Sequence, residues 1–254
     1  VLDASVGGGV RGWHRLRARR SGSLRHVDVH LVVEPTMTVA RAHEITDALE
    51  ALARAQRREL ERVAVLCAEA GTDYVDLFLI HWPLPTRYDG DFPATWKVLE
   101  EFVADGRARS IGVSNFTAAQ LDRLASHSST VPAVNQIEVH PYYTNDDVRA
   151  YGQAHGIATE AWSPIAQGRV LDDPAITAIA AALDRSAAQV VLRWHIQKGT
   201  VVFPKTMSPQ RMRENLSVFD FVLDDAAMAA IDGLDKGIAG RIGPDPDQFN
   251  WIPE

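Results

Sequence analysis

The fold of this chain is decided first by the stretch Tyr74-Val-Asp-Leu-Phe-Leu-Ile-His81. It is short, apolar and almost uninterrupted, which is the pattern of a strand buried on both faces of a parallel sheet. A helical pattern follows over residues 93–104, where Trp96, Leu99 and Val103 recur at helical spacing. The sequence therefore predicts a strand followed by a helix at this point of the chain.

The same alternation continues toward the C-terminus. Further strands are predicted at residues 110–113, 133–139, 157–161 and 200–203, and helices at 117–124, 145–155, 174–198 with a break near 186, 208–218 and 224–234. Strict alternation with short loops favours a parallel sheet, and right-handed crossovers would place its strands side by side. Five strands are fewer than the eight of a closed barrel. The pattern thus predicts an α/β fold, either an incomplete TIM-type (β/α) barrel or an open doubly wound sheet.

The first 70 residues follow a different pattern. Residues 24–33 alternate and predict a strand, and Thr38 is expected to open a helix. Six arginines lie within residues 11–25, a density that could serve nucleic acid or anionic lipid. Only Trp13 accompanies them as an aromatic, so a solvated strand or loop is the preferred interpretation and no nucleic-acid partner is expected.

Bulk properties restrict the class of protein. The chain carries a net charge of −7, and its single cysteine, Cys67, excludes an internal disulfide. It has no basic-then-apolar secretion pattern and no apolar run of about 18 residues, so no membrane span is expected. These properties predict a cytoplasmic protein.

Polar and aromatic residues follow each predicted strand of the second part. His81-Trp82 follows the first strand, Ser114-Asn115 the second, Trp162-Ser163 the fourth and Lys205-Thr206 the fifth, while Gln136 lies on the third. In a parallel α/β barrel, functional groups lie just past the carboxyl ends of the strands. These positions are therefore the candidate functional residues.

This order of motifs resembles the aldo-keto reductase family over residues 71–254. The resemblance rests on Gly71-Thr-Asp-Tyr-Val-Asp-Leu77, Ile111-Gly-Val-Ser-Asn-Phe116, Pro204-Lys-Thr206 and the tail Arg241-Ile-Gly-Pro-Asp-Pro-Asp247. It implies an NADPH-dependent reductase that acts on small aldehydes or ketones, built on a TIM-type barrel. The beginning of that barrel has no counterpart in the first 70 residues.

The resemblance also implies a role for each candidate position. Trp162 matches the aromatic residue that stacks on the nicotinamide, and Ser114, Asn115 and Gln136 match the groups that hold its carboxamide. The pyrophosphate loop corresponds to Ser163, Pro164, Ile165 and Gly168. The 2′-phosphate cluster corresponds to Lys205, Thr206 and Arg211, and the adenine contacts to Glu214 and Asn215. An Arg fork with a Lys point charge suits a dianionic phosphate. His81 matches the catalytic residue that orients the carbonyl, and Trp82 a substrate contact.

Three catalytic residues of the family are expected upstream and are missing. They are a Tyr that protonates the carbonyl oxygen, a Lys that lowers the pKa of this phenol, and an Asp that pairs with the Lys. Residues 1–70 contain no tyrosine and no lysine. The sequence therefore predicts impaired or absent carbonyl reductase activity.

A second resemblance covers residues 12–50, which look like part of the cytoplasmic domain of cation diffusion facilitator transporters. In that comparison His14, His30 and His43 match metal ligands. A closed zinc site needs four ligands, so these three are weak candidates and no metal site is expected. The histidines at 127, 155 and 195 lie outside all motifs and are interpreted as surface or hydrogen-bonded side chains.

Together the two resemblances predict a chimeric or truncated chain with a boundary between residues 56 and 57. The leading interpretation is an aldo-keto reductase homologue with a small-molecule carbonyl substrate. The alternatives are a non-catalytic NADPH-binding or interaction fragment and a weak zinc-binding module. An open sheet edge would also expose the chain to self-association.

Overall fold

The structure is a computed structural model that describes residues 10–21, 24–33, 73–87 and 90–251, with side chains from residue 73 onward. The chain divides into two compact units, Val1–Val75 and Asp76–Glu254. The helix predicted from Thr38 and the predicted boundary between residues 56 and 57 lie outside the described residues, and both stay predictions.

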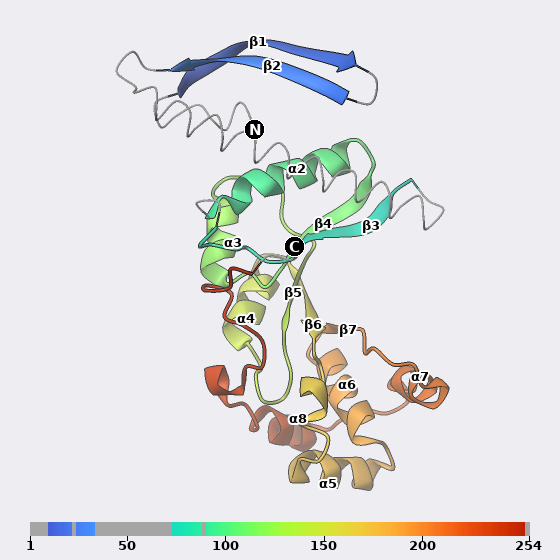
Figure 1. The fold of residues 1–254 in the computed structure, drawn as a ribbon. Coiled ribbons are helices and arrows are strands. Elements are labelled where there is room, and N and C mark those ends of the chain that lie inside the picture. Colours follow the sequence, from blue (N-terminus) through green and yellow to red (C-terminus); the bar gives the residue numbers. More distant parts are fainter. Residues whose placement is uncertain (1–9, 22–23, 34–72, 88–89, 252–254) are drawn as a thin grey trace. The chain divides into compact units, whose positions relative to one another are not determined.

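The first unit contains an antiparallel hairpin of two strands, β1 (Val10–Ser21) and β2 (Leu24–Val33) (Figure 1). The strand predicted at residues 24–33 is confirmed. For the arginine-rich residues before it, the sequence left strand and loop open, and the structure pairs them with β2 as a strand. Local sequence could not decide this because the ladder of hydrogen bonds, rather than side-chain pattern, defines the strand.

From Val75 onward strands and helices alternate (Figure 1). The strands are β3 (Val75–Ile80), β4 (Ala108–Ser114), β5 (Val134–Glu138), β6 (Ala158–Trp162) and β7 (Val201–Val202). The helices are α2 (Phe92–Ala104), α3 (Ala118–Ala125), α4 (Asp146–Ala154), α5 (Pro174–Leu183), α6 (Ala187–Gln197), α7 (Pro209–Leu216) and α8 (Asp225–Asp232), with short 3-10 helices η3 (Ala166–Gly168) and η4 (Gly237–Gly240). Every strand and helix predicted after residue 73 is present.

The strands form one sheet in the order β3-β4-β5-β6-β7. The pairs β4–β5, β5–β6 and β6–β7 are parallel, with Ser114 opposite Gln136 and Ala161 opposite Val202. Consecutive strands lie next to each other, as right-handed strand–helix–strand units require. The described residues thus supply five of the eight strands of a (β/α) barrel, which confirms the predicted incomplete barrel.

Helix starts follow the expected capping chemistry. Thr117 and Ser186 each form a capping box, with Gln120 and Gln189 respectively closing the reciprocal hydrogen bond. The break predicted near Ser186 is therefore a cap that begins a new helix, α6. Because a cap satisfies otherwise orphaned backbone N–H groups, these residues fix where the loops after the strands end.

The main hydrophobic core lies where α5, α6 and α8 pack against β5 and β6. Its fully buried members include Val139, Ala161, Ile176, Val190, Trp194 and Ile231. Toward β3 and β4 the packing is aromatic, with Phe92 and Phe116 edge to face at 5.0 Å. Gly112 of β4 permits a close approach of the neighbouring strands, because a Cβ there would lie 2.8 Å from the side chains of both Leu79 and Val134.

In the described part of the chain, no single helix is long and apolar enough to cross a membrane. The helices α5 and α6 satisfy that criterion only when they are taken together, and they are bent by 93° relative to each other.

Candidate cofactor site at the carboxyl edge of the sheet

Strained backbone gathers in the loops that follow the strands. Seven described non-glycine residues have positive φ, and all but Asp184 lie in the segments that follow strands at the carboxyl edge: Leu84, Asn115, Asn145, Ser163 and, within η3, Ala166 and Gln167. Left-handed conformations at such residues cost of order 1–3 kcal/mol and concentrate at functional sites. The carboxyl edge is therefore the natural place to look for a binding site.

Asn115 is the hub of a hydrogen-bond network at this edge. Its Oδ1 accepts a hydrogen bond from the indole N–H of Trp162 at 2.8 Å, and its Nδ2 donates to the backbone carbonyl of His81 at 3.0 Å. The left-handed backbone of Asn115, with φ of 63°, aims the amide in this direction. The network joins the ends of β3, β4 and β6, so the loops after these strands are held as one surface.

Ser114 and Gln136 complete the network next to Asn115. The Ser114 hydroxyl donates to the backbone carbonyl of Gln136 at 2.7 Å, and the Gln136 amide donates to Glu160 at 2.9 Å. Four predicted site residues (Ser114, Asn115, Gln136 and Trp162) thus lie together on three neighbouring strands. Glu160 was not among the predicted residues.

The loop after β6 contains the other predicted residues near Trp162. Ser163 and Gly168 both have positive φ, at 50° and 92°. Pro164 is buried, and its carbonyl accepts a hydrogen bond from Nε2 of His195 at 2.9 Å. Ile165 packs against the main core. The loop is consequently anchored at its centre, while its turns leave backbone groups at the edge of the sheet.

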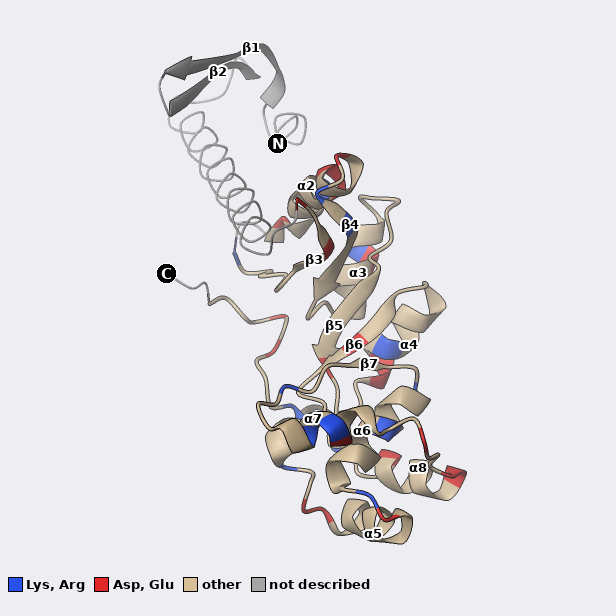
Figure 2. Cartoon of the chain, turned by 90° about the vertical axis from the view of Figure 1, so that its right-hand side faces the viewer, with Lys and Arg blue, Asp and Glu red and all other residues tan. Residues whose placement is uncertain are grey.

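The second predicted cluster begins after β7 and continues onto α7. Lys205 and Arg211 are exposed, and neither makes an ion pair with any described residue. Ser208 caps α7 by accepting from the Arg211 backbone N–H, and its own N–H donates to the Thr206 hydroxyl. Glu214 and Asn215 lie half-buried one turn further along the helix. Two cationic side chains without an ion-pair partner among the described residues, close to the start of a helix, favour the binding of an anion. Figure 2 shows the basic residues on α7.

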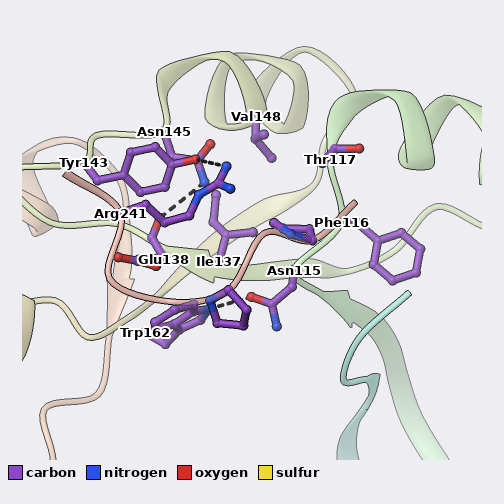
Figure 3. Close-up of a pocket in the computed structure, with 12 residues that line it drawn as sticks. Asn115, Phe116, Thr117, Ile137, Glu138, Tyr143, Asn145, Val148, Trp162 and Arg241 are labelled. Atoms are coloured by element: carbon purple, nitrogen blue, oxygen red, sulfur yellow. Dashed lines mark hydrogen bonds between the residues drawn. The ribbon is translucent and has the colours of Figure 1, made fainter. Parts of the chain in front are cut away.

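A small pocket opens beside Trp162 (Figure 3). It is lined by Asn115, Phe116, Thr117, Ile137, Glu138, Tyr143, Asn145, Val148, Trp162, Arg241, Pro244 and Pro246. Two of these, Asn115 and Trp162, were predicted as site residues. The others were missed, although the tail that carries Arg241 belongs to the motifs quoted above.

Glu138 is the best-buried charged group of this pocket, with a side chain only 4% exposed. One carboxylate oxygen accepts from His140 Nε2 at 2.9 Å and from the Ile242 backbone N–H at 2.6 Å, and the other accepts from the Gly243 N–H at 2.8 Å. Burial raises the pKa of Glu138, but these hydrogen bonds outweigh burial and hold the pKa below its usual value. The carboxylate is therefore charged at neutral pH.

His81 and Trp82 lie at the end of β3. His81 is exposed, and Trp82 packs against Phe249 of the C-terminal tail with ring centroids 4.2 Å apart and ring planes tilted by 35°. Three described tyrosine hydroxyls have partners elsewhere: Tyr142 bonds Asp173, Tyr151 bonds Asp122 and Tyr143 bonds Arg241. Burial and the bond to Asp122 raise the pKa of Tyr151 to about 12, which makes it a weak proton donor.

The histidines outside the motifs have local partners, as interpreted from the sequence. Rings of His127 and His155 bond the carbonyls of Arg123 and Tyr151. Among the described residues no group of three or more His, Cys, Asp or Glu is arranged to hold a metal ion. Of the weak metal candidates, His14 and His30 lie directly opposite each other in the hairpin, and His43 lies outside the described residues.

A parallel sheet of α/β-barrel type, with amide, hydroxyl and indole groups at its carboxyl edge, is the class of fold that this unit defines. The particular family follows from comparison with known proteins. Residues 50–236 match the aldo/keto reductase family, and the chain belongs to this family. Residues 4–65 match the cytoplasmic domain of cation efflux proteins, which confirms the second resemblance.

Curated relatives agree with this assignment. The chain is 50% identical over 192 residues to morphine 6-dehydrogenase of Pseudomonas putida, covering 69% of this chain and 62% of the relative. It is 44% identical over 177 residues to glyoxal reductase of Bacillus subtilis, covering 70% of this chain and 62% of the relative. The chain thus spans about three fifths of the length of these relatives.

Solved structures show the same fold. A mutant of Gox0644 in complex with NADPH has 44% identity and a TM-score of 0.72, covering 77% of this chain and 70% of that one. A Bombyx mori aldo-keto reductase in complex with NADP has 37% identity and a TM-score of 0.65, covering 71% and 64%.

Proposed function

We propose that this chain binds NADPH at the carboxyl edge of its sheet, in a pocket inherited from reductases of small aldehydes and ketones. The observation that carries the proposal is the bond from Trp162 to Asn115, which fixes a half-buried indole ring beside amide and hydroxyl groups. A flat ring with an adjoining set of amide donors and acceptors is the chemistry that suits a nicotinamide with its carboxamide. Ser114 and Gln136 would exchange their present partners for that carboxamide.

The cluster after β7 supports the choice of NADPH over NADH. Lys205 and Arg211 are exposed cations without an ion-pair partner among the described residues, and Thr206 adds a hydroxyl. An extra phosphate on the adenosine ribose would satisfy all three groups. The relatives solved with NADPH or NADP are consistent with this preference.

We propose further that the chain turns over carbonyl substrates poorly. NADPH, when bound, supplies a hydride to the carbonyl carbon, so the carbonyl oxygen must receive a proton, and a positioned side chain delivers that proton faster than water does. His81 can hold the oxygen at the end of β3, but residues 1–70, where the resemblance leads us to expect the catalytic Tyr and Lys, contain no tyrosine and no lysine. Loss of a positioned proton donor typically lowers the rate about 10²–10⁴-fold.

Two measurements on the full chain test these statements. NADPH titration should quench tryptophan fluorescence, more strongly than NADH at equal concentration. A turnover assay with glyoxal, with B. subtilis glyoxal reductase as positive control, should give a rate at least about 100-fold below the control. Absence of quenching would contradict the proposed NADPH site. A rate equal to that of the control would contradict the proposed loss of carbonyl reductase activity.

A second candidate function, weak zinc binding, is favoured by one feature of the hairpin. His14 and His30 are register partners across β1 and β2. Histidine is a common zinc ligand, although a closed site needs two more ligands than this pair supplies. Calorimetric titration with Zn²⁺ should show weak binding that His30→Ala removes. Unchanged binding in His30→Ala would exclude this pair.

A further inference from the structure

The C-terminal tail, residues 241–251, crosses the carboxyl edge of the sheet. It contacts, in chain order, Glu138 at the end of β5, Trp162 at the end of β6, Gln120 of α3, Trp82 after β3 and the side chain of Arg87. These contacts join positions more than 80 residues apart. The tail therefore lies over the same strand ends that carry the candidate cofactor site.

Glu138 is the strongest attachment of this tail. Its two oxygens accept the backbone N–H groups of Ile242 and Gly243, two consecutive amides, at 2.6 and 2.8 Å. Hydrogen bonds to an ionised, buried acceptor are about twice as strong as hydrogen bonds between neutral groups. His140 supplies a third hydrogen bond, so the carboxylate cannot turn away from the tail without losing partners.

Gly243 brings the attached tail against the indole of Trp162. A Cβ at this position would lie 2.3 Å from Cη2 of Trp162 and 2.9 Å from Oε2 of Glu138. Both distances are shorter than a Cβ atom tolerates, so only glycine lets the backbone of the tail pass this close to the ring and the carboxylate. The position of the tail and the position of the ring are consequently coupled.

We propose that Glu138 is a positioning residue that fastens the C-terminal tail against Trp162, so that the tail forms a wall of the ring-binding site. The part of this inference that concerns a ligand rests on the proposed NADPH site. The fastening itself concerns only the chain. When the carboxylate is lost, the tail lifts, the indole gains freedom and the wall beside a bound nicotinamide disappears.

Two substitutions weaken the attachment of the tail in different ways. Glu138→Gln keeps the shape of the side chain but replaces one acceptor oxygen with an NH₂ group. This donor would face a backbone N–H of the tail, which is also a donor, so that hydrogen bond is lost. Gly243→Ala keeps the carboxylate and forces the tail away from the ring. Asp232→Asn is the matched control, since the Asp232 carboxylate also accepts from an indole, that of Trp194 at 2.7 Å, and from Lys198, and it makes no hydrogen bond to the described residues of the tail.

The test is amide hydrogen exchange of the full chain, read on peptides that cover residues 241–248, followed by NADPH titration. We expect exchange at least about tenfold faster in both tail variants and unchanged in Asp232→Asn, since tenfold corresponds to roughly 1.4 kcal/mol. NADPH affinity should fall by a similar factor in the tail variants, while exchange in peptides from α5 and α6 stays as in the wild type.

The outcomes separate the two proposals. Unchanged tail exchange in Glu138→Gln and Gly243→Ala would overturn the fastening role whatever NADPH does. Faster tail exchange with unchanged NADPH affinity would support the role of Glu138 in holding the tail and would overturn the role of the tail as a wall of the binding site. If the wild-type chain shows no NADPH binding, the cofactor proposal fails, and the exchange rates still decide the role of Glu138. If Glu138→Gln does not fold, Gly243→Ala alone decides it.

Discussion

The indole N–H of Trp162 donates a hydrogen bond to Oδ1 of Asn115 at 2.8 Å, and this bond spans the sheet from the end of β6 to the end of β4. The strand between them, β5, carries Gln136, whose backbone carbonyl accepts the Ser114 hydroxyl. Three neighbouring strands are thereby linked at one edge. The arrangement orients the ring before any ligand arrives, which reduces the entropy that binding must overcome.

Trp162→Phe should weaken NADPH binding moderately, because the ring remains while its bond to Asn115 is lost. A net hydrogen bond contributes about 1 kcal/mol, so we expect roughly a fivefold increase in the dissociation constant. Trp162→Ala should cause a larger loss. The exposed Trp251 provides the control, since Trp251→Phe removes an indole that lies outside the network. Equal NADPH affinity in Trp162→Phe and wild type would show that the hydrogen bond from Trp162 to Asn115 does not contribute to binding.

Lys205→Ala and Arg211→Ala should each weaken NADPH binding about tenfold and leave NADH binding unchanged. Both side chains are exposed and make no ion pair with described residues, so their loss should not alter stability. Arg213→Ala is the matched control, because Arg213 lies on α7 together with Arg211. It should change the affinity for neither NADPH nor NADH. Competition titrations with the two nucleotides measure this, and equal losses for NADPH and NADH would contradict a role at the extra phosphate.

Much of this edge was predictable from the sequence, and the tail was not. Ser114, Asn115 and Trp162 follow recognisable strand patterns, and parallel strands bring their carboxyl ends to the same edge. Glu138 contacts Ile242 and Gly243 over more than 100 residues, and it does so through backbone amides, which carry no side-chain signature. Strand β1 was left open for a related reason, because its pairing with β2 decides its conformation.

His195 should make stability depend on pH. It is fully buried, and this burial lowers its pKa from 6.5 to about 3, although the Pro164 carbonyl opposes the shift and Arg149, His140 and Lys198 favour it. Below pH 6.5 the unfolded chain takes up a proton that the folded chain refuses, so stability is lost as the pH falls from about 6.5 toward 3.

The expected slope from this group is about 1.4 kcal/mol per pH unit. His195→Gln retains a donor for the Pro164 carbonyl but cannot titrate, so its unfolding free energy should fall less steeply over the same range. Urea unfolding at several pH values measures the difference. Parallel slopes in the two proteins would show that His195 does not control this dependence.

The edge strand β7 and the segment after it should promote self-association. Large apolar side chains are exposed here, including Phe203 at 47%, Leu216 at 74% and Phe219 at 70%. We expect light scattering to show concentration-dependent oligomers that Leu216→Lys and Phe219→Lys reduce. Val131→Lys, at an exposed apolar residue after α3, should have no effect. A monomer at every concentration would contradict the prediction.

All of the proposals about the cofactor depend on NADPH binding at the carboxyl edge of β3 to β7, with its nicotinamide ring against Trp162. Equilibrium titration of the full chain with NADPH, followed by energy transfer from tryptophan to the nicotinamide, tests it most directly. The account predicts saturable binding that Trp162→Ala abolishes. Saturable binding that survives intact in Trp162→Ala, or no binding by the wild-type chain, would contradict it.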